Sequence, residues 1–216
     1  MKITAADIGN FSGVAKMELS RPYKGNKDLG LDRKMAWMCD AFYGYVNEWK
    51  KVPTMDEFFS YYLQTNNGEY LDDDRVGFRG RRGWVEADIQ AVYDRLYLSY
   101  TGAIREVQLM LALCHRGINA WYDSDADRAG IDIMCDIGGL RIGVACYTYT
   151  QDGCARKKKK NNYHTYDIPM VDAPCVLGGH STVKLRNEQI LYTTPYMDGI
   201  AAQVQSTARM AGAESA

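Results

Sequence analysis

The stretch AGIDIMCDIGGLRIGVACYT, from Ala129 to Thr148, reads as two short apolar strands joined by a turn at Gly138 and Gly139. The first strand carries Asp132 in an apolar setting. A buried carboxylate is costly unless it is ion-paired, hydrogen-bonded or bound to a metal. The hairpin therefore raises two questions: which fold contains it, and what Asp132 contacts.

The elements around this hairpin predict an α/β or α+β fold with a mixed central sheet and flanking helices. A helix is expected before it, from about Val85 to Arg116, with Gly117 as its C-terminal stop. Glu106 borders the apolar face of this helix, and further strands follow the hairpin. We therefore expect residues 85–216 to form one α/β core.

The N-terminal region, residues 1–84, is expected to be a helical addition to that core. After an irregular arm of about thirty residues, helical spacing predicts one helix from Leu31 to Trp49. A second is expected from Thr54 to Gln64, where Thr54 and Glu57 form a capping-box pattern. Residues 65–84 are polar and glycine-rich, which indicates a loop.

Composition restricts the functional classes. The chain has 216 residues, a net charge of -1 and a pI near 6.3, so nucleic-acid binding would need local basic patches. The sequence contains neither a signal-peptide core nor an apolar run of membrane-spanning length, so a cytoplasmic protein without membrane contact is expected. The six cysteines form no C-x-x-C pair and the three histidines no spaced cluster, which argues against structural zinc.

A glutamate-bearing helix, a strand and then Gly130-Ile131-Asp132 at the start of a hairpin resemble the core of the PD-(D/E)XK restriction-endonuclease-like superfamily. The resemblance covers roughly Ala103 to Tyr149. It implies a magnesium-dependent DNA endonuclease in which Asp132 and Glu106 bind the metal. A further acidic or glutamine side chain and a lysine are expected on the next strand.

That next strand departs from the superfamily pattern. The acidic residue and the lysine would fall near Val144 and Cys146, and neither side chain can replace them at a magnesium site. A catalytic lysine from elsewhere, Lys157 or Lys184, is one alternative, with magnesium as cofactor. Loss of catalysis, with no cofactor, is the other. Asp132 also has a purely structural alternative, in which it accepts hydrogen bonds from turn amides or pairs with Arg141.

Two basic segments are candidates for DNA contact. Phe78 and Trp84 are interleaved with the first group of arginines, a chemistry suited to phosphates and bases, although pairing with Asp72, Asp73 and Asp74 is an equal alternative. The second segment is a lysine-rich run that phosphate contact or simple solvation would explain. The candidate nucleic-acid-binding residues are Arg79, Arg81, Arg82, Arg156, Lys157, Lys158, Lys159 and Lys160.

The sequence therefore predicts a DNA-associated protein with a divergent or catalytically inactive nuclease-like core. The resemblance implies an origin in a phage, a restriction system or another mobile element. The alternative is a non-catalytic adaptor that uses the same fold to bind a protein partner or a second copy of itself. In the nuclease-like case, the carboxylates of Glu106 and Asp132 should face one accessible pocket.

Overall fold

The computed structural model describes residues 1–9, 11, 20–25, 29–150, 154–155, 166–185 and 189–214. The chain forms two compact units: an N-terminal unit of residues 7–103, and a C-terminal unit of residues 1–6 and 104–216. The division passes through the long helix α4 (Ile89–His115), whereas a boundary after Trp84 would fall inside strand β4 (Gly83–Asp88).

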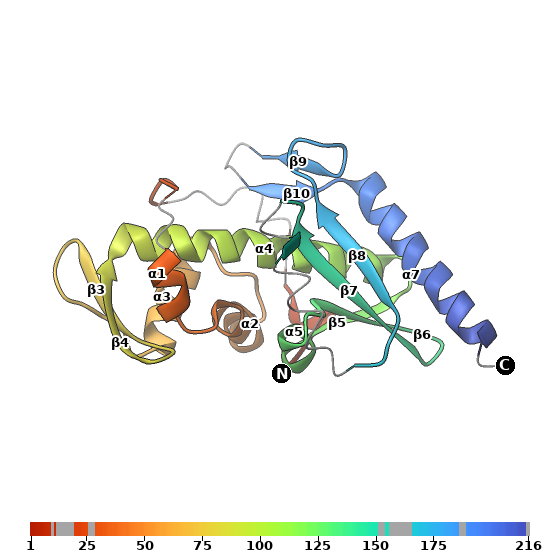
Figure 1. The fold of residues 1–216 in the computed structure, drawn as a ribbon, viewed down its shortest axis with the longest axis horizontal. Helices are drawn as coiled ribbons and strands as arrows, with labels where there is room; N and C mark the ends of the chain where they lie inside the picture. Colours follow the sequence, from red (N-terminus) through yellow and green to blue (C-terminus); the bar gives the residue numbers. More distant parts are fainter. Residues whose placement is uncertain are drawn as a thin grey trace. The chain divides into compact units, whose positions relative to one another are not determined.

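The C-terminal unit is built on a five-stranded mixed sheet (Figure 1). Its strand order is β1-β5-β6-β7-β8; the first four strands pair antiparallel, and β7 and β8 pair parallel. The turn between β6 and β7 has positive φ at Gly138 and Gly139, as the sequence predicts for a tight hairpin. The strands are β1 (Lys2–Thr4), β5 (Asn119–Asp123), β6 (Ile133–Ile137), β7 (Leu140–Thr148) and β8 (Met170–Cys175).

Both faces of this sheet are covered by apolar side chains. One face presents Met134, which packs in a cluster with Trp121, Ala126 and Ile131. The other presents Val144, and helix α7 packs on β6, β7 and β8. The remaining elements of the unit are the 3-10 helix η1 (Ala5–Asp7), which runs to the unit boundary, α5 (Ser124–Arg128), the hairpin of β9 (Thr182–Lys184) and β10 (Ile190–Tyr192), and α7 (Thr194–Glu214).

In the N-terminal unit, the single helix expected from Leu31 to Trp49 is wrong, because it is divided into α1 (Leu29–Lys34) and α2 (Met38–Trp49). At the break, the Lys34 carbonyl accepts a hydrogen bond from the Arg81 amide (2.8 Å), and not from an amide of the next helical turn. The Ala36 amide donates to the Tyr62 hydroxyl (3.0 Å). Partners from other elements therefore satisfy the backbone groups that a continuous helix would have paired.

The loop expected over residues 65–84 is also wrong, because half of it lies in an antiparallel sheet of β2 (Glu69–Tyr70), β3 (Arg75–Gly80) and β4. Val76 and Phe78 of β3 are buried, and they alternate with the exposed Arg75 and Arg79. That alternation is the pattern of a half-buried strand, and the glycines obscured it.

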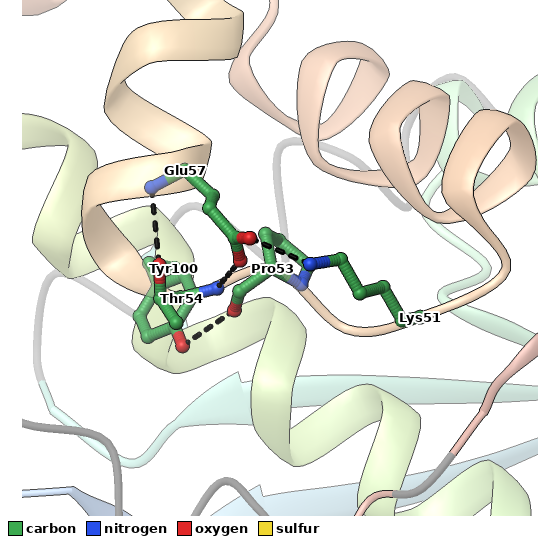
Figure 2. A network of polar contacts seen from close by, with 5 residues as sticks. All are labelled: Lys51, Pro53, Thr54, Glu57 and Tyr100. Carbon is green, nitrogen blue, oxygen red and sulfur yellow. Dashed lines mark hydrogen bonds and ion pairs between the residues drawn. The ribbon is translucent and has the colours of Figure 1, made fainter.

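Helix α3 (Met55–Thr65) begins as the sequence predicts, and a polar network fixes its first turn (Figure 2). The Thr54 hydroxyl accepts from the Glu57 amide (3.1 Å), and the Glu57 carboxylate accepts from the Thr54 amide (2.7 Å). Lys51 donates to the same carboxylate (2.6 Å), and the Tyr100 hydroxyl donates to the Pro53 carbonyl (2.9 Å). Each polar group drawn in this network thus has a partner within hydrogen-bonding distance.

No helix within the described ranges combines the length and apolar character needed to cross a membrane.

Candidate functional site

Asp132 lies in a bend immediately before β6 and is only 6% exposed. Its amide donates to the Val144 carbonyl (3.0 Å), and its carboxylate accepts from the Cys146 amide (2.6 Å). The carboxylate therefore binds a backbone amide of β7, at the point where pairing with β6 ends. The donor of this hydrogen bond is therefore a strand amide of β7.

The pairing of Asp132 with Arg141, expected as a structural alternative, does not fit the strand register. Arg141 lies opposite Asp136, at the far end of β6. Four residues of strand separate Asp136 from Asp132, which corresponds to about 13 Å. That distance is beyond the reach of an arginine and an aspartate side chain across one hairpin.

Glu106 and Asp132 come from different elements of the C-terminal unit, and their charges both affect the pKa of the Cys146 thiol. Burial raises the pKa of Cys146 well above its usual value, and the charges of Asp132 and Glu106 raise it further. Glu106 is half-buried on α4, and Cys146 is on β7. Both carboxylates therefore lie in the electrostatic neighbourhood of Cys146, whose thiol stays protonated and is a poor nucleophile or metal ligand.

In the register of β7, the residues beside Asp132 are the two positions at which the sequence lacks the expected acidic residue and lysine. Val144 lies directly opposite Ile133 and is fully buried, and Cys146 is the next residue on the same face. The two β7 side chains beside Asp132 therefore supply neither a carboxylate nor an amine. In the part of the chain that the structure describes, no three His, Cys, Asp or Glu residues are grouped so as to hold a metal ion.

The candidate lysines are placed only in part. Lys184 lies at the end of β9, opposite Ile190 of β10, with an exposed side chain. Lys157 lies outside the described residues, as do Arg156, Lys158, Lys159 and Lys160. Their proposed roles in catalysis and phosphate contact therefore stay predictions.

The aspartates of the turn after β5 have structural contacts. The Asp123 carboxylate accepts from the amides of Asp125 (2.9 Å) and Ala126 (3.1 Å) and so caps α5. Asp127 is buried and accepts a hydrogen bond from the Tyr122 hydroxyl (3.3 Å). Helix capping and hydrogen bonding within the fold account for these two carboxylates.

Next to the carboxylate pair, α4 is joined to the last hairpin by contacts that the sequence did not indicate. The side-chain amide of Gln108 pairs with both backbone groups of Tyr192, at 3.0 and 2.8 Å. The Tyr192 hydroxyl donates to the Ala173 carbonyl of β8 (3.1 Å). Tyr196 donates to the Pro174 carbonyl (2.6 Å), and its ring stacks on Tyr192 with centroids 5.1 Å apart.

Arg105 is the functional candidate that sequence reasoning missed. It precedes Gln108 by about one turn of α4 and is 9% exposed. Its positive charge lowers the pKa values of the Cys146 and Cys175 thiols against the larger effect of burial. Within the described ranges, its guanidinium has neither a hydrogen bond nor an ion pair. Beside Glu106 in the sequence it resembles an ordinary charged helix residue, so no local pattern marks it.

The arginines of the N-terminal unit lie around one hairpin. Arg79 pairs across the strands with Trp84, a residue that is 49% exposed and whose ring lies over Gly77. Arg81 and Arg82 form the exposed turn, and the Arg81 guanidinium lies 5.4 Å from the ring centre of Trp37. Figure 1 shows this hairpin as β3 and β4. We refer to Arg79, Arg81, Arg82 and Trp84 as the basic hairpin.

The structure does not fit two expectations for this hairpin. Phe78 is fully buried against Tyr62, so it cannot stack on a base as expected. Among the described residues, the side chains of Arg79 and Arg82 make no ion pair, and the pair that forms nearby joins Arg75 to Glu86. The proposed pairing of the hairpin arginines with Asp72, Asp73 and Asp74 is therefore not what the structure contains.

No family model matches the chain, and no curated protein or solved structure is similar enough to count as a match.

Proposed function

We propose that this protein binds DNA through a divergent core of the restriction-endonuclease-like type that has lost efficient catalysis. The observation that carries the proposal is the pair Glu106, on a helix, and Asp132, at a strand end. The charges of both raise the pKa of Cys146 on β7, and Asp132 also accepts a hydrogen bond from the Cys146 amide. The order of a helix, an antiparallel three-stranded meander and a parallel strand supports it. As the resemblance implies, we propose an origin in a phage, a restriction system or another mobile element.

The chemistry of the site explains why cleavage should be absent or slow. Magnesium prefers near-octahedral oxygen coordination, and here one of the two carboxylates already accepts the Cys146 amide. The neighbouring β7 side chains, Val144 and Cys146, offer no hard ligand and no base to activate water. These residues do not form a complete magnesium site, so we derive no metal-dependent step from them.

The basic hairpin supplies chemistry for DNA binding in the N-terminal unit. Exposed guanidinium groups bind phosphates in bidentate geometry, and an exposed indole is a stacking platform for an unpaired base. Arg79 and Arg82 are exposed and Trp84 is half-exposed. We propose that the two arginines contact DNA phosphates and that Trp84 stacks on an unpaired base, because a nearly neutral chain needs a local patch of this kind.

The experiment measures DNA binding and cleavage by the full-length protein with and without magnesium or manganese. We expect metal-independent binding and little or no cleavage of plasmid, linear or single-stranded DNA. Replacing Arg79, Arg81 and Arg82 together by alanine should weaken binding and reduce the salt dependence by about 0.9 per lost phosphate contact. Arg209→Ala, at an exposed arginine of α7, is the matched control and should change neither quantity.

Two outcomes contradict this proposal. Brisk cleavage that is lost on Asp132→Asn or Lys184→Ala identifies an active endonuclease with a lysine from another element. No DNA binding under any condition, together with capture of a protein partner or formation of a homodimer, favours the adaptor alternative.

A further inference from the structure

The sheet of β2, β3 and β4 has an exposed face on which an indole covers a glycine. Arg79 of β3 and Trp84 of β4 lie directly opposite each other and so share this face. The Trp84 ring extends diagonally over Gly77, where a Cβ atom would lie 2.8 Å from Cε2 and 3.1 Å from Nε1 of the indole. Glycine therefore leaves the space that the ring occupies, and Trp84 is held against the strand while it stays 49% exposed.

Two carboxylates flank the position that the ring covers. Glu69 of β2 and Glu86 of β4 are the register partners of Gly77, which places their Cβ atoms about 5 Å from that position on either side. Glu86 forms an ion pair with Arg75 at 2.5 Å. Glu69 is exposed and forms no ion pair with any described residue. The indole thus has one carboxylate beside it that the sheet does not neutralise.

We propose that this face binds single-stranded DNA at an unpaired guanine, which stacks on Trp84 and donates hydrogen bonds to Glu69. The inference rests on the proposed function, in which Trp84 stacks on an unpaired base, and it adds the identity of that base. The Watson–Crick edge of guanine carries adjacent N–H donors at N1 and N2, which match the two acceptor oxygens of a carboxylate. The other three bases place an acceptor next to their donor, and a carboxylate repels it.

The charges around the ring fit the two ends of such a nucleotide. From Gly77, Arg79 lies two residues further along β3, whereas Glu69 lies across on β2. Arg82 is exposed in the turn that follows β3. Guanidinium groups on one side suit the phosphates, and a carboxylate on the other suits the base donors. In duplex DNA the Watson–Crick edge is already paired, so this face should select an unpaired strand.

A purely structural role of the ring makes a different prediction. An aromatic side chain that covers a glycine of the neighbouring strand can stabilise a sheet without any ligand. That role involves Trp84 and Gly77 and gives Glu69 no part. Selectivity between bases therefore separates the two roles, whereas a loss of stability does not.

The experiment measures the affinity of the full-length protein for short fluorescent oligothymidine strands with one central guanine, adenine or inosine. The guanine strand should bind about tenfold more tightly than the adenine strand, as one bidentate contact provides. Inosine, which keeps N1–H and lacks the N2 amino group, should lie between them. Glu69→Gln should abolish most of this preference. Glu86→Gln, at the carboxylate that Arg75 already binds, is the matched control and should keep it.

Two further variants test the position of the ring. Trp84→Ala should weaken binding of each single strand about tenfold, the stacking contribution of one base. Gly77→Ala keeps the indole but displaces it, because the added Cβ would overlap the ring, so binding should weaken again. Urea unfolding shows whether both variants fold. Glu69→Gln, at an exposed position of an edge strand, provides the test if either does not.

Three results overturn the guanine site: equal affinity of the wild type for the guanine and adenine strands, a guanine preference that Glu69→Gln leaves unchanged, or tighter binding of the duplex than of the guanine strand. If replacing the arginines of the basic hairpin still weakens binding in these cases, the proposed function stands without the guanine site. No binding of any strand or duplex rejects the proposed function, and the guanine site with it.

Discussion

The two units each contain a cluster of charged and polar residues, and the clusters differ in how completely they are paired. In the N-terminal unit, the network of Lys51, Thr54 and Glu57 begins a helix, and each charge meets an opposite charge or an amide. In the C-terminal unit, Asp132 and Arg105 are both buried near Cys146, and Arg105 has no ion pair with any described residue. The contacts of the first cluster stabilise the start of a helix, whereas those of the second join Asp132 to a neighbouring strand.

The largest expected effect concerns Asp132, whose carboxylate binds the Cys146 amide at 2.6 Å. Asp132→Ala leaves this amide without its acceptor and should reduce the free energy of unfolding by about 2 kcal/mol. Asp132→Asn keeps an acceptor oxygen and removes the charge, so it should cost clearly less. Chemical unfolding of both variants makes the comparison. Equal losses would mean that the charge, not the hydrogen bond, holds the strand end.

A smaller effect is expected at Tyr100 in the paired network. Its hydroxyl donates to the Pro53 carbonyl at 2.9 Å in a buried position. Tyr100→Phe keeps the ring and removes the donor, which should reduce the free energy of unfolding by about 1 to 1.5 kcal/mol. Thermal or urea unfolding measures this loss. Tyr70→Phe, at a tyrosine that is 63% exposed, is the control and should have no effect.

The capping box should contribute slightly less. Thr54→Ala removes the hydroxyl that accepts the Glu57 amide and should cost about 1 kcal/mol, the usual value for an N-cap. Thr54→Ser keeps the hydroxyl and should restore most of the stability. If serine and alanine destabilise equally, the β-branched methyl group, not the cap, is the stabilising feature.

The network of Lys51, Thr54 and Glu57 was predictable from sequence, and the cluster around Asp132 only in part, for physical reasons. Thr54 and Glu57 lie three residues apart, so a local pattern suffices, and the turn at Gly138 and Gly139 is equally local. Asp132 could be singled out because it stands in an apolar stretch of the sequence. Its acceptor role for the Cys146 amide depends on the register of two strands, which no short pattern determines.

Other features are decided by contacts that are distant in the sequence. Strand β1 exists because Lys2 to Thr4 pair with β5, more than a hundred residues away, so the irregular arm predicted for this segment is wrong there. The burial of Arg105 depends on how β7, β8 and β10 cover α4, so its sequence neighbourhood carries no signal. In the basic hairpin, by contrast, the alternation of β3 was present in the sequence, but its glycines favoured a loop.

The smallest expected effect is an acid dependence of stability from Glu57. Burial alone would raise the pKa of Glu57, but hydrogen bonds from Lys51, the Thr54 amide and Tyr45 outweigh it and lower the pKa. A carboxyl with a lowered pKa in the folded state stabilises the fold above its unfolded pKa of about 4.3. That stability is lost as the pH falls through the lower folded value. Because both side chains of the Lys51 ion pair are partly exposed, the contribution should stay below about 1 kcal/mol. Urea unfolding between pH 6 and pH 3 should show a shallower decline for Glu57→Gln, which keeps a capping-box acceptor, than for the wild type. Identical declines would mean that the network is paired in the structure without contributing to acid stability, and its contrast with Asp132 and Arg105 would then rest on hydrogen bonds alone.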